Sequence, residues 1–341
     1  MPLIDPSGGN NLTSYNALLT TTLQNFRNQL VDNFSDATPT MWWLTSNGRK
    51  RTYSGGQSIE VPLMYGATQV QPFSGYDNLL TEPAEGIAPA TFLAKKYQVP
   101  IVISRDHETD NMGESAIINL LEAKVKQAEI SFKEELNRDM INNGYAGATS
   151  GVGTVAPDPM RITGFFDFLQ DAAGTRPYGG IANTNAWWKN QVIDIQTPSA
   201  PATDALLQAA LIENMRTLYL NCSRGSDAPD LVLCDQATYE LYEETLVSDK
   251  RFVNTNAADA GFESLMYRAT TILFDRDMPA NTLVMLNSNY ITLYVHSDVD
   301  MASTPFREAE NQWARFSRIL WKGELTCSNR ARQGLMTRIS T

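Results

Sequence analysis

The stretch from Asp110 to Gly144, DNMGESAIINLLEAKVKQAEISFKEELNRDMINNG, decides the fold that this sequence can form. Asn111 followed three residues later by Glu114 is typical of a helix start, and Gly144 is typical of a helix end. A helix between them would be roughly 48 Å long, well beyond the usual globular helix. Its apolar residues recur every three or four positions and are predicted to form the core face of a spine helix: Ile117, Leu121, Val125, Ala128, Phe132, Leu136 and Met140.

Two segments before this helix alternate in polarity as strands do. Residues 59–63 place Ile59, Val61 and Leu63 on one face, and residues 97–103 place Tyr97, Val99, Ile101 and Ile103 on one face. The connection between them is about thirty residues long, rich in glycine and proline, and shows Phe73 and Tyr76 on a polar background. This connection is therefore a candidate for a protruding hairpin, with a flexible surface loop as the alternative.

Helices and strands are interleaved after the spine. Thr203 or Asp204 is expected to cap a second helix, whose inward residues are Leu206, Leu207, Ala210, Leu211, Met215 and Leu218. Further elements are predicted as strands at 231–234, 270–274, 283–286 and 291–295, and as a helix at 237–246. This middle part of the chain, which begins near Ile162, should therefore be α/β or α+β. A long strand through Trp313 and Cys327 and a second one at 335–339 are expected to return to an earlier domain.

Residues 1–45 form a polar segment that looks like an arm. Apolar residues at helical spacing run from Leu18 to Phe34. This stripe can be buried only against the body of its own chain or against a neighbouring subunit, and the pattern does not distinguish the two. A basic turn containing Arg49, Lys50 and Arg51 follows.

Composition narrows the classes of function. The 341 residues are 43% hydrophobic with a formal net charge of −11, which excludes a wholly disordered chain and disfavours an avid DNA binder. The charge is uneven, with +4 over residues 301–341 and −15 over residues 1–300. Cys222, Cys234 and Cys327 are expected to be core thiols in a reducing compartment. Neither a signal peptide nor a membrane-spanning run is apparent, so neither export nor a membrane partner is expected.

Groups that could perform chemistry are few. His107 lies in a charged turn and His296 at a predicted strand end, and neither has a second ligand at metal-binding spacing. Residues 151–156 carry the letters of a dinucleotide fingerprint, but they lack the preceding strand and following helix that the motif requires. We therefore predict no catalytic residue, no cofactor and no metal, and a protein that is not an enzyme.

The order of these pieces resembles the major capsid protein family of tailed bacteriophages, which has the same fold as encapsulin shell proteins. The local stretches that carry the resemblance are residues 54–63, 111–143, 230–239 and 267–287. It implies an α+β phage-capsid-type fold. The implied parts are an N-terminal arm (1–45), an extended loop (46–104), a peripheral domain on the spine helix (105–154), an axial domain (155–300) and C-terminal strands returning to the peripheral domain (301–341).

The resemblance also implies a function. The chain would self-assemble as pentamers and hexamers into an icosahedral head that encloses double-stranded DNA with weak, non-specific contact. The arm and the extended loop would lie over neighbouring subunits, with Arg49, Lys50, Arg51, Phe73 and Tyr76 at the contacts. Further expected partners are a portal protein, a separate scaffolding protein and a decoration protein. Assembly would take place in the host cytoplasm and the product would be the virion. The alternatives are an encapsulin-like nanocompartment and a soluble enzyme with an unrecognised carboxylate site.

Overall fold

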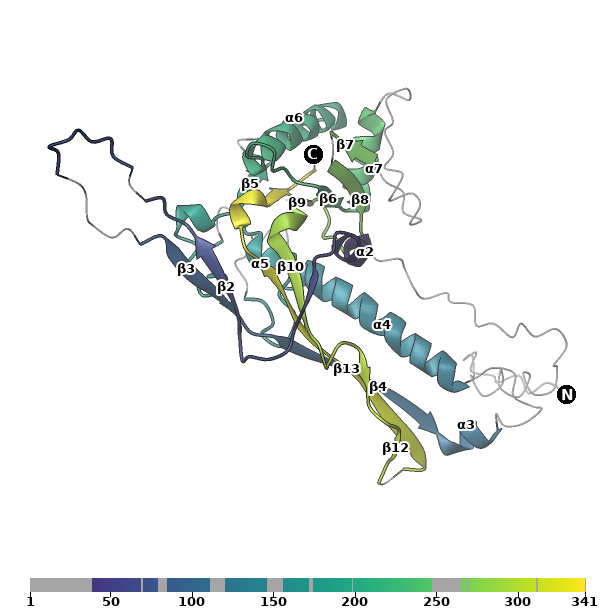
Figure 1. Cartoon of the computed structure of the whole chain (residues 1–341). Helices are drawn as coiled ribbons and strands as arrows, with labels where there is room; N and C mark the ends of the chain where they lie inside the picture. The colour runs from purple at the N-terminus through teal and green to yellow at the C-terminus, as the bar shows by residue number, and fades with distance from the viewer. Residues whose placement is uncertain are drawn as a thin grey trace.

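The computed structural model describes most of the chain after residue 38. The described residues are 39–68, 70–78, 85–110, 120–145, 156–171, 174–197, 199–246, 265–268, 270–310 and 312–340. The predicted arm up to residue 38, the start of the spine with Ile117, and the glycine-rich residues 146–155 lie outside them. Figure 1 shows a body built around a long helix and a long sheet, from which one loop projects far to the side.

The spine helix is α4, Leu120–Asn142, so the prediction is confirmed over that range. Phe132, Leu136 and Met140 are buried on one face, and Val125 is half-buried nearer the N-terminal end. The side chain of Leu121 lies outside the described part of the chain. Spacing of three and four residues brings these side chains to one face, because an α-helix turns once every 3.6 residues.

A long sheet packs against this helix. Its central strand β13 (Ala314–Cys327) pairs antiparallel with β4 (Lys95–Ser104) along the whole of β4. The neighbouring strands are β10 (Ile291–His296), β1 (Lys50–Tyr53), β11 (Ala302–Ser303) and β12 (Arg307–Glu308). Ile101, Ile103 and Ile319 form one cluster with Ala128 of α4, which fixes the sheet on the helix.

A second sheet lies in the part of the body at the top of Figure 1. Its strand order is β5 (Gln191–Asp194), β14 (Gly334–Thr337), β9 (Leu283–Leu286), β6 (Leu231–Cys234), β8 (Thr270–Phe274) and β7 (Leu265–Tyr267). The helices α6 (Asp204–Cys222) and α7 (Gln236–Thr245) contact this sheet. Together with β10 of the long sheet, these elements confirm the helices and strands predicted between residues 203 and 295.

Two details of the second sheet differ from expectation. Thr203, one of the two residues expected to cap α6, is its cap, but Leu206 is 56% exposed and the prediction of an inward Leu206 is wrong. The buried stripe begins at Leu207, and Leu206 lies one position off it. The strand β14 lies between β5 and β9, so the expectation that both closing strands return to the peripheral domain is wrong for residues 334–337. A run of four buried residues fits the middle of any sheet, so the sequence pattern does not indicate whether this strand belongs to the long sheet or to the second sheet.

The extended loop is built on a separate two-stranded sheet. Strand β2 (Ile59–Met64) pairs antiparallel with β3 (Ile87–Phe92), and the chain between them projects from the body (Figure 1). The partner of β2 is therefore β3, whereas the predicted strand 97–103 belongs to the long sheet. Pro62 and Pro89 face each other in this pair. Proline is tolerated there because both strands are sheet edges.

Short helices complete the fold. They are α2 (Pro39–Ser46), α3 (Arg105–Asp110), α5 (Phe165–Phe168) and the 3₁₀ turns Ala186–Trp188, Ser288–Tyr290 and Arg330–Arg332. Trp43 and Leu44 of α2 are buried in the main core, so the end of the predicted arm is part of the body. All three cysteines are free and buried, as predicted. No helix in the described part of the chain is long and apolar enough to cross a membrane.

Candidate assembly site

The extended loop exposes large apolar side chains. Phe73 is 67% exposed and Tyr76 is fully exposed. Met64, Val70 and Ile87 of the same loop are also largely exposed. Single exposed apolar residues are ordinary, but a group of them on one projecting segment marks an interaction surface.

The root of this loop is held firmly by the body. The ring of Tyr65 stacks on Trp187, with centroids 4.8 Å apart. The backbone N–H of Thr91 donates to the carbonyl oxygen of Gly179 at 3.0 Å. A Cβ on Gly86 would lie 2.9 Å from the carbonyl oxygen of Gly66. The outgoing and returning backbone segments of the loop therefore approach each other so closely that only glycine fits. The loop therefore leaves the body in a defined direction.

The residues predicted to lie at subunit contacts do not form a single site. Arg49, Lys50 and Arg51 lie at the start of the long sheet, where the Arg49 guanidinium donates to Asn289 at 2.6 Å and Lys50 pairs with Asp300. Arg51 is exposed. Phe73 and Tyr76 lie on the loop, away from this strand. The two basic residues that have partners within their own chain are less available to a neighbour than the sequence indicates.

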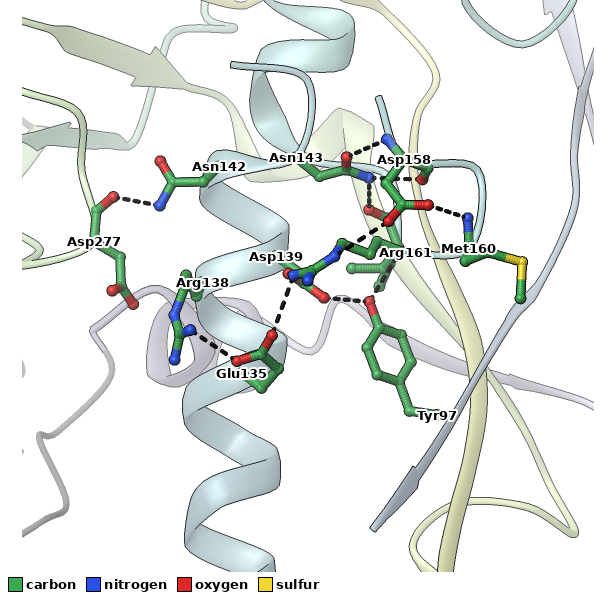
Figure 2. A network of polar contacts seen from close by, with 11 residues as sticks. Tyr97, Glu135, Arg138, Asp139, Asn142, Asn143, Asp158, Met160, Arg161 and Asp277 are labelled. Atoms are coloured by element: carbon green, nitrogen blue, oxygen red, sulfur yellow. Dashed lines mark hydrogen bonds and ion pairs between the residues drawn. The ribbon is translucent and has the colours of Figure 1, made fainter. Parts of the chain in front are cut away.

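A polar junction lies at the C-terminal half of the spine helix (Figure 2). The carboxylate of Asp139 is almost fully buried, and it accepts hydrogen bonds from the hydroxyl of Tyr97 at 2.7 Å and from the guanidinium of Arg161. The Tyr97 oxygen in turn accepts from the backbone N–H of Ile162 at 2.8 Å. Burial, and to a lesser degree the bond to Asp139, raise the pKa of Tyr97 far above its ordinary value.

The same junction joins the spine to two other parts of the chain. Asn143 donates to the carbonyl oxygen of Ile162 at 2.7 Å and accepts from the N–H of Asp158 at 2.9 Å. Asn142 donates to the carbonyl oxygen of Asp277 at 2.9 Å (Figure 2). The long sheet, the 156–162 segment and the 275–278 turn therefore meet on one helix. Every contact joins structural elements, and the arrangement fixes their relative position.

The sequence reasoning missed this junction. Asp139 follows Leu136 by three residues and so lies on the apolar stripe of the helix, which is the one signal that could have indicated a buried polar contact. The sequence places Tyr97 on a strand face and indicates no partner for its hydroxyl. Nothing in the pattern connects either residue to Arg161.

Another buried carboxylate is that of Glu324. It accepts hydrogen bonds from the backbone N–H groups of Thr163 at 2.8 Å and Leu325 at 3.1 Å. Burial raises its pKa to about 7. Asp275, also buried, accepts from the Thr40 hydroxyl at 2.9 Å, and burial raises its pKa. Both carboxylates are held by backbone, amide or hydroxyl donors that support the fold. Among the described residues no group of three potential metal ligands occurs.

Residues 101–330, more than half of the chain, match the sequence model of the SU10 major capsid protein. The chain belongs to the SU10 major capsid protein family. No curated protein sequence matches it significantly. The match confirms the expected resemblance to phage major capsid proteins, and membership of the family indicates a structural role in the virion.

Solved capsid structures share the fold of this family member. The capsid asymmetric unit of cyanophage A-1(L) is 17% identical, with 94% of this chain and 97% of that chain covered and a TM-score of 0.64. The capsid of the native GTA particle is 11% identical, with 92% and 95% covered and a TM-score of 0.58. The SrpI encapsulin of Synechococcus elongatus is 8% identical, with 100% and 98% covered and a TM-score of 0.51. At these identities the likeness shows the fold, and it confirms the predicted α+β capsid-type architecture.

Proposed function

We propose that this chain is a shell-forming major capsid protein that assembles with copies of itself, as pentamers and hexamers, into an icosahedral head around double-stranded DNA. The extended loop carries this proposal. The strands β2 and β3 are packed into the main core through Leu63 and Phe92, but the exposed side chains of Phe73 and Tyr76 on the chain between them gain nothing from water. A neighbouring subunit that covers them supplies the missing apolar contact.

The charge of the chain supports a container for DNA. A net charge of −11 disfavours strong binding of the phosphate backbone, because such binding depends on clustered lysine and arginine. A shell wall must let DNA enter and leave. Contact between the shell and the packaged DNA is therefore weak and non-specific in this proposal.

The remaining partners follow from the family and stay part of the proposal. They are a portal protein, a separate scaffolding protein and a decoration protein, with assembly in the host cytoplasm. The N-terminal arm, whose stripe runs from Leu18 to Phe34, would lie over a neighbouring subunit. The proposal also divides the chain into domains, with boundaries at residues 45, 104, 154 and 300.

An encapsulin-like compartment is the second candidate, because the SrpI encapsulin has the same fold. The match of residues 101–330 to a phage capsid family favours the viral head. The third candidate, an enzyme with a carboxylate site, gains no support from the described carboxylates. Glu324 and Asp275 are both engaged by donors that hold the fold together.

Assembly of the purified chain tests the proposal. Sedimentation velocity and electron microscopy should show capsomers or closed shells, with and without a co-expressed scaffolding protein. A chain that stays monomeric under all assembly conditions would contradict a shell function. Particles isolated from a producing cell should contain nuclease-sensitive DNA only after they are opened. A particle that is filled with an enzyme and free of DNA would instead support the hypothesis of an encapsulin-like compartment.

A further inference from the structure

Four polar side chains meet beside the spine helix and are called here the Asp275 cluster. They are Thr40 of α2, Asn137 of α4, and Asp275 and Asp277 of the turn that follows β8. The amide nitrogen of Asn137 donates to Asp277 at 2.9 Å and lies 3.4 Å from each carboxylate oxygen of Asp275. The hydroxyl of Thr40 donates to Asp275 at 2.9 Å. The cluster therefore gathers several oxygen atoms from three separate elements.

The Asp275 cluster is buried on all sides but one. Thr40 is fully buried, and Asn137 and Asp275 are 1% and 3% exposed. Asp277, which lies beside the spine helix at Asn142 (Figure 2), is half-buried, so the cluster can be reached from solvent at this side chain. Asp275 accepts from three neutral groups, the Thr40 hydroxyl, the Asn137 amide and the backbone N–H of Asp277. Such bonds stabilise a buried carboxylate without cancelling its charge.

The amide of Asn137 provides a second, independent observation. Its oxygen Oδ1 is buried and has no hydrogen-bond partner in the described part of the chain, although the same amide lies against both carboxylates. Native proteins rarely leave a buried acceptor without a partner, because the loss of its bond to water is costly. A half-turn about the last side-chain bond exchanges the amide oxygen and nitrogen and brings Oδ1 to the carboxylates. That orientation is stable only if a cation lies between the oxygens.

The spacing of the cluster suits Ca²⁺. This ion binds about six to eight oxygen atoms at about 2.3–2.6 Å, and its neighbouring ligands are about 72–90° apart in the pentagonal-bipyramidal geometry. Two oxygens at about 2.4 Å from the ion are then about 2.8–3.4 Å from each other. The distances from the Asn137 amide to the two carboxylates, 2.9 and 3.4 Å, lie in this range, as does the 2.9 Å from Thr40 to Asp275. Two carboxylates also balance the charge of one divalent cation.

Mg²⁺ suits the cluster less well than Ca²⁺. It requires a near-ideal octahedron at about 2.0–2.1 Å and usually keeps several of its water ligands. Thr40, Asn137 and Asp275 are buried, so water can approach mainly at Asp277. A site with several protein oxygens and a single open side therefore favours the larger ion, which accepts irregular ligand sets.

We propose that the Asp275 cluster binds one Ca²⁺ ion. Both carboxylates, the amide oxygen of Asn137 and the hydroxyl oxygen of Thr40 are the protein ligands, and water at the side of Asp277 completes the set. The ion joins α2, the spine helix and the turn at residues 275–278 within one subunit. The inference therefore goes beyond the proposed shell function and does not depend on it.

The sequence prediction of no metal did not cover this arrangement. It was based on spacing along the chain, whereas Thr40 and Asn137 are 235 and 138 positions away from Asp275. The described chain has no group of three acidic, histidine or cysteine side chains that could hold a metal. The cluster is a candidate only because two neutral oxygens join its two carboxylates.

Calcium titration of the purified chain tests the site. The protein is treated with EDTA and exchanged into metal-free buffer, and CaCl₂ or MgCl₂ is then added in a calorimeter. We expect one Ca²⁺ per chain, bound at least about tenfold more tightly than Mg²⁺. Ca²⁺ at about 100 times its dissociation constant should raise the midpoint of thermal unfolding by about 3–5 °C.

A variant and its matched control locate the ion. Asp277→Asn keeps the size of a half-buried side chain and removes one negative ligand, so it should weaken Ca²⁺ binding at least about tenfold. Asp298→Asn, the same change at an exposed residue outside the cluster, should bind Ca²⁺ normally. Hydrogen exchange of the unchanged chain needs no variant. Ca²⁺ should slow exchange in peptides that contain Asn137 or residues 275–277 and leave peptides of α6 unchanged.

Several results would overturn the inference. One is an unchanged chain that binds no Ca²⁺ at concentrations up to about 1 mM. Another is equal binding by Asp277→Asn and the unchanged chain, or slowed exchange only in other parts of the chain, which would show non-specific binding to an acidic protein. Tighter binding of Mg²⁺ would contradict the choice of ion. None of these results bears on the shell function, which is tested by assembly.

Discussion

The exposed aromatic residues of the extended loop give the sharpest test of its role. Replacement of both in the variant Phe73→Ser with Tyr76→Ser removes two side chains that contact water in the isolated subunit. Because Phe73 is 67% exposed and Tyr76 is fully exposed, the free energy of unfolding of the subunit should change by no more than about 0.5 kcal/mol.

The expected effect on assembly is much larger. Complete burial of one such side chain contributes about 1.5–3 kcal/mol, so two of them contribute about 3–6 kcal/mol to each loop contact. Association retains only part of this value, since ordering the loop and the partner costs free energy. A retained 2 kcal/mol corresponds to a roughly thirtyfold weaker contact.

The assay compares assembly and folding in the same preparation. Light scattering and sedimentation velocity report capsomer formation over a range of protein concentrations, and urea unfolding reports subunit stability. Met160→Ser is the matched control, because Met160 is 78% exposed and lies outside the loop. Normal assembly of the double variant would refute the role of the loop. A loss of more than about 1 kcal/mol in subunit stability would show that the loop tip supports the fold of its own chain.

Three further predictions concern the body of the subunit. Tyr97→Phe removes the hydroxyl that joins Asp139 to Ile162 and should lower the free energy of unfolding by about 1–3 kcal/mol in urea, while Tyr76→Phe should leave it unchanged. Phe132→Ala, which empties a site between Tyr97 and Trp321, should cost about 3–5 kcal/mol, whereas the exposed neighbour Lys133→Ala should cost little. Burial raises the pKa of Glu324 from 4.5 to about 7, so the folded state holds this proton more tightly and stability should fall as pH rises from about 4.5 to about 7. Glu324→Gln should remove up to about 3 kcal/mol of that dependence, and equal slopes in the two proteins would contradict the assignment.

Local patterns predicted most of the elements. The apolar stripe of α6 and its capping residue are short-range signals, so neighbouring residues predict the helix and limit its cap to Thr203 or Asp204, although they wrongly place Leu206 on the stripe. The strand β3 was missed because Pro89 interrupts it, although proline is acceptable in a strand whose edge faces solvent. Sequence patterns therefore predict helices and central strands well. They predict edge strands poorly, because an edge strand tolerates a proline that would break a central strand.

Sheet membership and the polar junction depend on long-range contacts. The four residues of β14 are all buried, and burial alone does not say which sheet contains them. Asp139 and Tyr97 are 42 positions apart, and their bond forms only after β4 has been packed on the spine helix. Long-range contacts also explain why the sequence overestimates the availability of Arg49 and Lys50 for a neighbouring subunit. In the structure these two side chains bind Asn289 and Asp300 of their own chain.

Tyr178 links the direction of the loop to the long sheet. Its ring packs against Phe92 of β3 with centroids 5.2 Å apart, and its hydroxyl oxygen accepts a hydrogen bond from the backbone N–H of Cys327 at 2.8 Å. Its carbonyl oxygen accepts from the indole N–H of Trp188 at 3.1 Å, next to the ring on which Tyr65 stacks. One buried residue thus contacts β3 of the loop, the central strand β13 and the segment that anchors the loop. The direction in which the loop leaves the body therefore depends on the position of β13, because the Tyr178 ring that packs against β3 is itself held by its hydroxyl on Cys327.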